Sequence, residues 1–347
     1  MKTTKILITC ALGDYMKSEI DCIKSISDKD IGSIEIYGAD MNQQDYPYVD
    51  LEMCFKVPKV SDPFYADVIY QICYCLGIDL LIPTHSAELS IFKNLKEKFE
   101  KIGTKIMVAG GDIETANDKI LLDKAMKSYG IPTPCSEEIT TYEDLLVFIC
   151  SHPEKRFCIK MRNGCGGRGF YIIGDSLYST GDQTGERFIS LESLEPLFEF
   201  RPSSYLVQEY LPNDEYTVDM LCVKGKMVAG AVKLNTSVVN GVAENSRIVC
   251  CPEAIEICSA IASQLCLDGN VGFDLKRGSD GVLYVIDVNP RLTATISLVV
   301  KAGLDLIHLG IRKALGFELP KEIPEAREGI KIHRKLCDVF EKDGELL

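Results

Sequence analysis

The first 110 residues of the chain alternate between strand-like and helix-like segments, and this alternation constrains the fold more than any other feature. Strands are predicted at 5–12, 33–41, 78–84 and 104–110, and helices at 13–27, 64–77 and 88–103. Parallel strands need a long crossover connection, and a helix between successive strands supplies it. The pattern therefore predicts a parallel sheet covered by helices in the N-terminal part of the chain.

The first turn of this predicted sheet lacks the glycine pattern of dinucleotide-binding enzymes. Residues 11–14 read ALGD rather than beginning G-x-G-x-x-G, which argues against a nicotinamide-dependent dehydrogenase. Ligands of such sheets bind beyond the carboxyl ends of the strands. One of these ends carries His85, Ser86 and Glu88, which are candidates for substrate contacts. In the alternative interpretation, Ser86 caps a helix and Glu88 is an acid of its first turn.

The overall composition excludes several classes of protein. The net charge of -13 at pH 7 argues against a nucleic-acid partner, which would favour a basic face. The 15 cysteines are scattered and form no C-x-x-C pair, so we expect free thiols in a reducing cytoplasm. The N-terminal apolar run is too short for a signal peptide, and no apolar run is long enough to span a membrane.

A glycine-rich loop is predicted between two strands, over residues 160–170. It contains four glycines and two arginines: Gly164, Gly166, Gly167, Gly169, Arg162 and Arg168. Glycines let backbone N–H groups approach an anion closely, and basic side chains add charge. The loop therefore predicts a phosphate-binding segment, with a flexible hairpin tip as the alternative. It is not a Walker loop, which needs G-K-[ST] at the start of a helix. We expect Cys165 to fill space rather than to act as a nucleophile.

A predicted hairpin in the C-terminal part of the chain brings two acids and an amide to one face of a sheet. Asp274 and Asp287 stand on arms joined by a turn at 278–281, so they lie directly opposite each other or one diagonal step apart. Asn289 follows two residues after Asp287 and shares its face. Such hard oxygen donors suit Mg²⁺ that bridges nucleotide phosphates. The alternative is a solvated acidic face, but the apolar neighbours predict a mostly buried hairpin, where unpaired acids would be costly.

A third element is the end of a predicted strand, made of Gln208, Glu209, Tyr210 and Leu211. Backbone groups at a hinge between two lobes can bind the edge of an adenine ring, and Glu215 could bind ribose hydroxyls. The glycine-rich loop, the strand end at 208–211 and the acidic hairpin are each unspecific alone. Their order along the chain is the specific feature.

In this order the elements resemble the ATP-grasp superfamily, in particular the branch with the carbamoyl phosphate synthetase large subunit, biotin carboxylase and amino-acid ligases. The resemblance covers nearly the whole chain. It implies a Rossmann-like parallel α/β domain at 1–112, followed by an ATP-grasp domain at 113–347. That second domain would combine a lid at about 130–208 with an antiparallel-sheet core, so the fold class is α/β together with α+β.

The resemblance also implies a nucleotide site. Lys119, which follows Asp118, and Lys160 would hold the α- and β-phosphates. The lid residues and the hinge residues would complete the site: Gly166, Gly167, Arg168, Gln208, Glu209, Tyr210, Leu211 and Glu215.

The metal motif of the family is usually E-x-N-x-R, and residues 287–291 read DVNPR. Asp287 keeps the charge but shortens the reach by one methylene. Whether one or two ions of Mg²⁺, or Mn²⁺ in its place, bind with Asp274 and Asn289 therefore stays open. The resemblance gives Arg291, with Lys160, a catalytic role in stabilising an acyl phosphate or a tetrahedral oxyanion. Lys233 and Arg247 are candidates, on charge and position alone, for anchoring a substrate carboxylate, with a structural role as the alternative.

The implied reaction is ATP-dependent phosphorylation of a carboxylate to an acyl phosphate, which an amine then attacks, with release of ADP and phosphate. The partners are thus small-molecule carboxylate and amine substrates, and paired subunits are common in families of this kind, which suggests a homodimer. One alternative is a bicarbonate-activating carboxylase or a carbamoyl phosphate synthetase-like enzyme. Another is a non-catalytic nucleotide sensor, which predicts damaged metal ligands, whereas Asp274, Asp287 and Asn289 are present.

Overall fold

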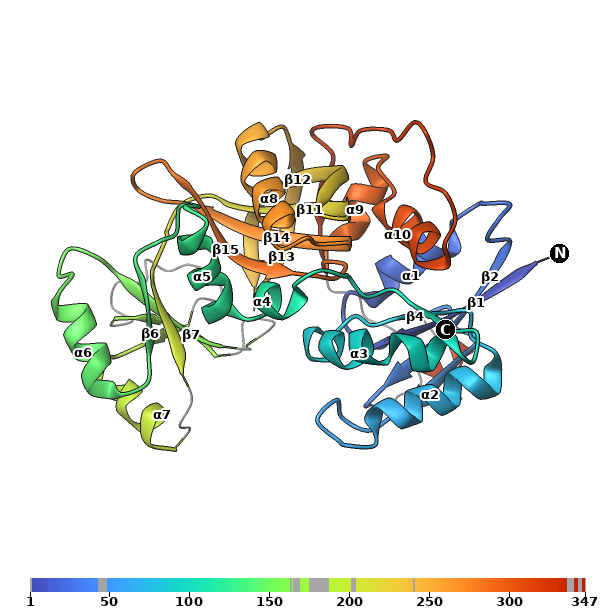
Figure 1. Ribbon diagram of the computed structural model, residues 1–347, viewed down its shortest axis with the longest axis horizontal. Coiled ribbons are helices and arrows are strands. Elements are labelled where there is room, and N and C mark those ends of the chain that lie inside the picture. The colour runs from blue at the N-terminus through green and yellow to red at the C-terminus, as the bar shows by residue number, and fades with distance from the viewer. Residues whose placement is uncertain are drawn as a thin grey trace.

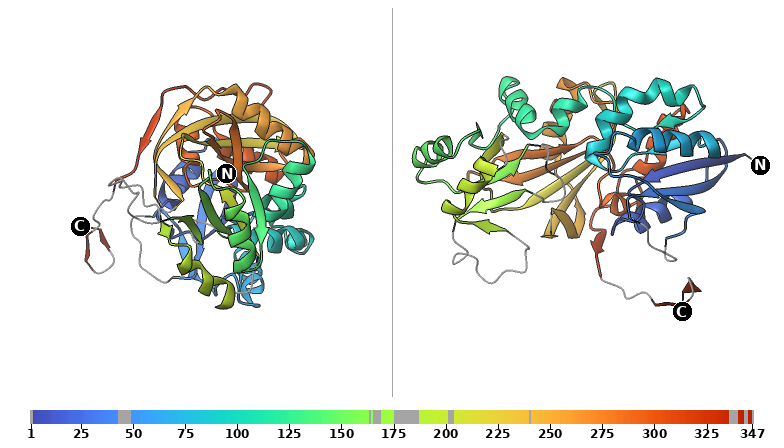
Figure 2. Two further views of the ribbon diagram at one scale, coloured as in Figure 1. Left: turned by 90° about the vertical axis from the view of Figure 1, so that its left-hand side faces the viewer. Right: turned by 90° about the horizontal axis from the view of Figure 1, so that it is seen from below.

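The computed structural model describes residues 2–42, 49–162, 164, 169–174, 187–200, 204–239, 241–335, 340–342 and 345–346. The strands in these ranges form three large sheets and one two-stranded sheet, β17 (Glu341–Lys342) with β18 (Glu345–Leu346). The large sheets are arranged along the longest axis of the molecule (Figure 1). We name them by their order in the sequence, not in space, as the N-terminal, middle and C-terminal sheets. Seen from below, the C-terminal sheet lies between the other two (Figure 2).

The N-terminal sheet is parallel throughout, as the alternation of strands and helices predicted. Its order is β3 (Met53–Lys56), β2 (Ser33–Asp40), β1 (Thr3–Thr9), β4 (Leu80–Ile82) and β5 (Lys105–Ile106). Its helices are α1 (Met16–Lys24), α2 (Tyr65–Leu76), η1 (Ser86–Glu88) and α3 (Leu89–Glu100). The strand order reverses between β1 and β4, which is where sheets of this kind bind ligands. The sequence patterns missed β3, because its four residues are largely exposed and too few to show a period.

Local chemistry explains where several helices begin and end. Gly77, at φ 63°, ends α2 in the left-handed conformation that glycine adopts without steric cost. The Asp118 side chain accepts hydrogen bonds from two backbone N–H groups in the first turn of α5 (Lys119–Ser128). The cap of α5 matters for function, because it places Lys119 at the first position of that helix.

The middle sheet has the order β6 (Ser136–Ile139), β10 (Tyr205–Glu209), β7 (Phe157–Met161), β8 (Phe170–Ile173) and β9 (Phe188–Ile189). The short helix α4 (Ile113–Asn117) and α5 lead into it, and α6 (Tyr142–Cys150), η3 (Glu192–Leu194) and α7 (Glu195–Phe200) belong to the same region. A separate apolar cluster that includes Leu145, Phe157 and Val207 forms its core.

The C-terminal sheet is antiparallel. Its order is β15 (Leu283–Asn289), β14 (Gly269–Arg277), β11 (Glu215–Val223), β12 (Lys226–Val239), β13 (Val242–Val249) and β16 (Lys331–His333). Helix α8 (Pro252–Gln264) packs against β11 and β12, while α9 (Ile296–Lys301) and α10 (Leu306–Leu315) extend toward the N-terminal sheet (Figure 1).

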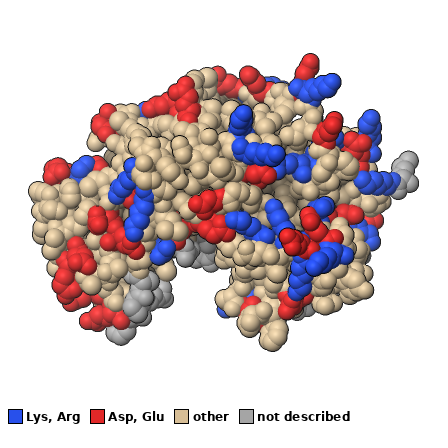
Figure 3. Space-filling model, viewed as in Figure 1, with Lys and Arg blue, Asp and Glu red and all other residues tan. Residues whose placement is uncertain are grey.

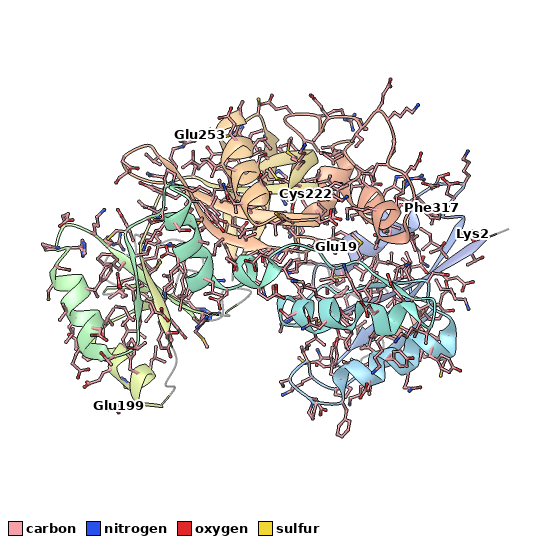
Figure 4. All side chains as sticks on the ribbon, in the orientation of Figure 1. Lys2, Glu19, Glu199, Cys222, Glu253 and Phe317 are labelled. Atoms are coloured by element: carbon pink, nitrogen blue, oxygen red, sulfur yellow. The ribbon has the colours of Figure 1, made fainter. Side chains whose placement is uncertain are left out.

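The N-terminal and C-terminal sheets share their apolar core. Leu7 and Leu81 of the first sheet belong to the same buried cluster as Val218 and Phe273 of the last. At the rim, the Lys2 ammonium lies 4.7 Å from the centre of the Phe317 ring, and the two side chains are neighbours at the right of Figure 4. The domain boundaries at residue 112 and at about 130–208 stay predictions. Within the described residues, no helix is long and apolar enough to cross a membrane.

Candidate active site

The middle and C-terminal sheets, together with η1 and the start of α3 from the N-terminal region, line one large cleft of about 1360 Å³, which we call the main cleft. Most of the predicted site residues line it: His85, Ser86, Lys119, Lys160, Gln208, Glu209, Tyr210, Leu211, Glu215, Asp274, Asp287, Asn289 and Arg291. Gly166, Gly167 and Arg168 lie outside the described residues. The structure therefore brings together residues that are up to 206 positions apart in the sequence, from His85 to Arg291.

Asp274 and Asp287 lie directly opposite each other in the β14–β15 ladder. The register shifts by one residue after this pair, at Ile286, which forms a β-bulge. In a regular strand Val285 and Asp287 would point to the same face. The bulge changes the phase, so that Val285 and Val288 are both buried while Asp287 faces the cleft. The two carboxylates owe their shared face to this one extra residue.

Asp274 lies in a crowded acidic environment. Thr217 donates a hydrogen bond to its Oδ1 atom at 2.8 Å, and the Asn289 amide donates to its Oδ2 atom at 3.1 Å. Burial raises the pKa of Asp274 to about 7, with further repulsion from Asp287 and Glu215. A divalent cation among these oxygens would relieve that repulsion, so the donor set fits Mg²⁺.

The fit depends on an amide as well as on acids. Among the described residues there is no group of three or more His, Cys, Asp or Glu side chains arranged to hold a metal. Asp274 and Asp287 need Asn289 as the third donor. With its side-chain amide rotated so that Oδ1 turns toward the acids, Asn289 would be the third ligand, in exchange for the hydrogen bond that Oδ1 now accepts from Arg291.

Two lysines approach the acids from the side of the middle sheet. The Lys119 ammonium lies 3.0 Å from Asp287 Oδ1 and donates to the Gly164 carbonyl at 3.0 Å. It therefore joins the start of the glycine-rich loop to the acidic pair. Lys160 is buried, donates to Gln208 Oε1 at 2.7 Å, and has its pKa lowered mainly by burial. Both ammonium groups face the cleft where polyanionic phosphates would lie.

The predicted adenine hinge lies at the end of β10, where Glu209 pairs with Lys155 at 2.6 Å. The neighbouring Tyr210 ring has the Lys276 ammonium 5.6 Å from its centre. Lys276 also lies 3.6 Å from Glu215, the residue predicted to bind ribose. The sequence analysis missed Lys276, although it follows Asp274 by two positions in β14. The period-two argument that we used for Asn289 would have found it.

Arg291 connects the metal motif to the N-terminal sheet. Its Nε atom donates to Ser86 Oγ at 3.1 Å, and its Nη2 atom donates to Asn289 Oδ1 at 3.2 Å. His85, rather than Ser86, caps the helical turn that follows, since its side chain accepts from the Ala87 N–H at 3.1 Å. The alternative interpretation in which Ser86 caps the helix is therefore wrong, and the Ser86 hydroxyl instead accepts a hydrogen bond from Arg291.

Glu88 does not line the cleft. Its carboxylate is fully buried and accepts hydrogen bonds from Thr9 at 2.6 Å and from Tyr65 at 2.8 Å. Burial raises its pKa. Thr9 in turn accepts from the Thr84 N–H at 3.0 Å, so Glu88 belongs to a network that holds the strand ends at the switch point of the N-terminal sheet.

Lys233 and Arg247, the candidate anchors for a substrate carboxylate, are also placed away from the cleft. Lys233 is fully buried, with its ammonium 2.6 Å from Asp219 Oδ2. It also donates to Thr293 and Thr295 at 3.1 and 2.6 Å, which follow the metal motif and do line the cleft. Lys233 thus holds two threonines of the cleft wall in place from the protein interior. Arg247 is exposed on β13 and is not a lining residue.

A parallel sheet with a switch point, a separate middle sheet and paired acids on an antiparallel hairpin are together the features of an ATP-grasp protein. Comparison with solved structures agrees. N5-carboxyaminoimidazole synthetase from Staphylococcus aureus, complexed with ADP, superposes with a TM-score of 0.66 at 17% identity, over 93% of this chain and 80% of that one. L-amino acid ligase from Bacillus licheniformis superposes with a TM-score of 0.65 at 16% identity, over 94% and 76% of the two chains.

Sequence comparison gives the narrower assignment. The family described as ATP-grasp in the biosynthetic pathway with Ter operon matches residues 201–335, and the PylC-like N-terminal domain matches residues 13–107. The carbamoyl phosphate synthase large chain of Agathobacter rectalis is 23% identical over 237 residues, which are 64% of this chain and 21% of that protein. This chain therefore matches only about a fifth of that curated relative. The chain thus has the fold of ATP-grasp proteins, and its residues 201–335 match an ATP-grasp family.

Proposed function

We propose that this protein is an ATP- and Mg²⁺-dependent ligase that phosphorylates a carboxylate and couples the acyl phosphate to an amine. The observation that carries the proposal is the joint placement of Asp274, Asp287 and Arg291 with Lys119 and Lys160 around one cleft. A cluster of opposite charges in a cleft is what phosphoryl transfer requires, because catalysis there is mainly positional and electrostatic.

Each residue has a distinct task in this proposal. Asp274, Asp287 and Asn289 would hold the metal ion, which when bound would neutralise the β- and γ-phosphates. Lys160 is held by Gln208 and would contact the phosphate chain. Lys119, which now pairs with Asp287, would exchange that contact for a phosphate oxygen.

Arg291 would stabilise the negative charge on the phosphorylated carboxylate and on the tetrahedral species that forms when the amine attacks. Its guanidinium lies at the border between the metal motif and the loop that carries Ser86, which is where the N-terminal sheet meets the cleft. We infer that the carboxylate substrate enters from this border. The Arg291 donors that now bind Ser86 and Asn289 are then the groups that recognise it.

A second candidate function is activation of bicarbonate. The biotin carboxylase domain of Hydrogenobacter thermophilus 2-oxoglutarate carboxylase was solved with MgADP and bicarbonate, and it superposes with a TM-score of 0.69 at 17% identity. Bicarbonate presents the same anionic CO2 group as a carboxylate, so the same cations would serve its phosphorylation.

An ADP-release screen over pairs of carboxylates and amines tests the proposal. We expect one productive pair whose turnover requires Mg²⁺ and both substrates. Turnover with bicarbonate alone would instead support the second candidate. If no pair and no bicarbonate released ADP while the protein still bound Mg·ATP, both proposals would fail in favour of a nucleotide sensor.

We keep three further expectations as proposals. The described cysteines are free thiols, which supports a reducing cytoplasm as the compartment. Residues 1–112 and 113–347 are proposed as two domains, with the lid at about 130–208. A homodimer is proposed by analogy with the biotin carboxylase domain, which was solved as a dimer.

A further inference from the structure

A second cavity, which we call the rear cavity, lies where the N-terminal and C-terminal sheets meet. It has a volume of about 150 Å³ and is lined by parts of α3, β5, α10 and the start of β14. Pro290, Arg291 and Leu292 also line it. Because Arg291 lines the main cleft as well, the segment 290–292 forms a wall that the two cavities share.

The rear cavity carries more positive than negative charge. Three lysines and two acids line it: Lys96, Lys105, Lys313, Glu100 and Asp268. Lys105 pairs with Glu100 at 3.0 Å, and Lys313 pairs with Asp268 at 2.8 Å. Lys96 donates to the Val108 carbonyl at 3.0 Å and forms no ion pair with any residue that the structure describes. One ammonium group therefore exceeds the number of carboxylates.

Lys96 lies beside a second cation of the cavity. Its pKa is lowered, first by burial and then by repulsion from Lys313, while attraction from Asp268 and Glu100 acts in the opposite direction. An anion between the two ammonium groups would reverse that repulsion. Figure 3 shows Lys and Arg side chains, interspersed with Asp and Glu, on the face of the molecule where α3 and α10 lie.

A buried amide adds a second requirement on the ligand. Asn270 lines the rear cavity, and its Nδ2 atom donates to the Leu306 carbonyl at 2.9 Å. Its Oδ1 atom is buried and has no hydrogen-bond partner within the described part of the chain. A buried acceptor of this kind is costly unless a donor reaches it. The preferred ligand therefore has oxygen acceptors for the lysines, and an O–H donor on it would serve Asn270 once a small rotation of that side chain turns Oδ1 toward the cavity.

We propose that the rear cavity binds a small tetrahedral oxyanion of the phosphate class. Hydrogen phosphate carries both acceptor oxygens and an O–H group, and the cavity is far smaller than the sites that bind nucleotides or drug-sized ligands. A bound ion would contact the rear of the segment 290–292 and so stabilise the position of Arg291. The inference does not depend on the proposed function, because the site can be tested without ATP.

The test is a calorimetric titration of the full chain with inorganic phosphate. The key variant is Lys96→Met, which keeps the aliphatic stem and removes the charge. Loss of one charged hydrogen bond should weaken phosphate binding by about tenfold. Lys98→Met is the matched control, since Lys98 lies on the same helix and pairs with Asp67 at 2.8 Å, outside the cavity. It should bind phosphate as the unmodified chain does.

Further variants make the outcome decisive. Lys160→Met removes a cation of the main cleft and should leave phosphate binding at the rear cavity unchanged. Lys96→Arg restores the charge and should recover binding, while Lys96→Gln replaces the methionine variant if that one fails to fold. Equal binding by Lys96→Met and the unmodified chain, loss of binding only in Lys160→Met, or no binding at all would overturn the proposal. Methyl phosphate distinguishes two sources of the ligand. If it binds as well as inorganic phosphate, the ligand is the phosphoryl group of a larger molecule. If it does not bind, the ligand is the free ion.

Discussion

The β14–β15 hairpin and the loop at residues 83–89 both border the main cleft. The sequence predicted which side chains line the cleft better for the hairpin than for the loop. The structure places Asp274 and Asp287 directly opposite each other, as one of the two expected registers required. Of the three polar candidates in the loop, His85 and Ser86 line the cleft, while Glu88 is buried in the core. Polar residues within four positions of one another are therefore used in different ways.

The difference comes from how far away the partners lie. Asp274 and Asp287 are only 13 positions apart, across a short turn, so a register argument reaches the pair, although the bulge at Ile286 that completes their alignment was not predicted. The partners of Glu88 are Thr9, 79 positions earlier, and Tyr65, 23 positions earlier. Local periodicity contains no information about such partners. A polar residue next to a predicted site is thus weaker evidence in a strand–helix loop than in a hairpin.

The largest expected effect is that of Asp287→Asn. The substitution removes one of the two proposed metal carboxylates, so Mg²⁺-dependent ADP release should fall by at least about 100-fold. The fold should persist, because Asp287 faces the cleft and pairs there with Lys119. Steady-state ADP release and circular dichroism on the same preparation measure both effects. Unchanged turnover would remove the hairpin acids from the mechanism.

Glu88→Ala should show the opposite pattern, with stability lost and chemistry retained. The Thr9 and Tyr65 hydroxyls would lose their buried acceptor, and a cavity would remain, at a cost of about 3 kcal/mol in the free energy of unfolding. Urea unfolding measures this cost. If turnover disappeared while stability stayed the same, Glu88 would belong to the active site after all, and the contrast between the two regions would be lost.

The same residue predicts a pH dependence. Burial raises the pKa of Glu88 above that of a glutamate in the unfolded chain, so the native state retains its proton to higher pH. The free energy of unfolding should therefore decrease as the pH rises through this interval and level off above it. Glu88→Gln should remove this part of the decrease, which a pH series of urea titrations would detect. An identical pH profile for both chains would show that Glu88 does not titrate in this way.

The smallest effect is expected for Ser86→Ala. It removes the acceptor of the Arg291 Nε donor, which is bound at 3.1 Å. Loss of one such hydrogen bond should slow ADP release by roughly fivefold. The KM for ATP should stay the same, because Ser86 lies in η1, after β4 of the N-terminal sheet, rather than in the hinge. Ser90→Ala is the matched control, since Ser90 also lines the cleft. A change of equal size in both variants would mean that Ser86 does not orient Arg291.

Much of the fold could be predicted from the sequence, because parallel α/β alternation and a hairpin with a short turn show clear periodic patterns. Less of the site could be predicted. Lys276 was within reach of the period-two argument, but the bulge at Ile286 was not, because a strand that reads VIDVN shows no sign of an extra residue. Without the bulge, parity alone would place Asp287 on the buried face with Val285.

The sequence by itself determined which elements form, and which acids, lysines and amide are available in which order along the chain. Only the tertiary structure decided their use. Lys160 and Lys233 are both lysines on apolar strands, yet Lys160 lines the cleft while Lys233 is sealed against Asp219 beneath it. The physical reason is that a charge in a protein interior must be paired, and the partner is chosen by packing between distant strands rather than by neighbours in sequence.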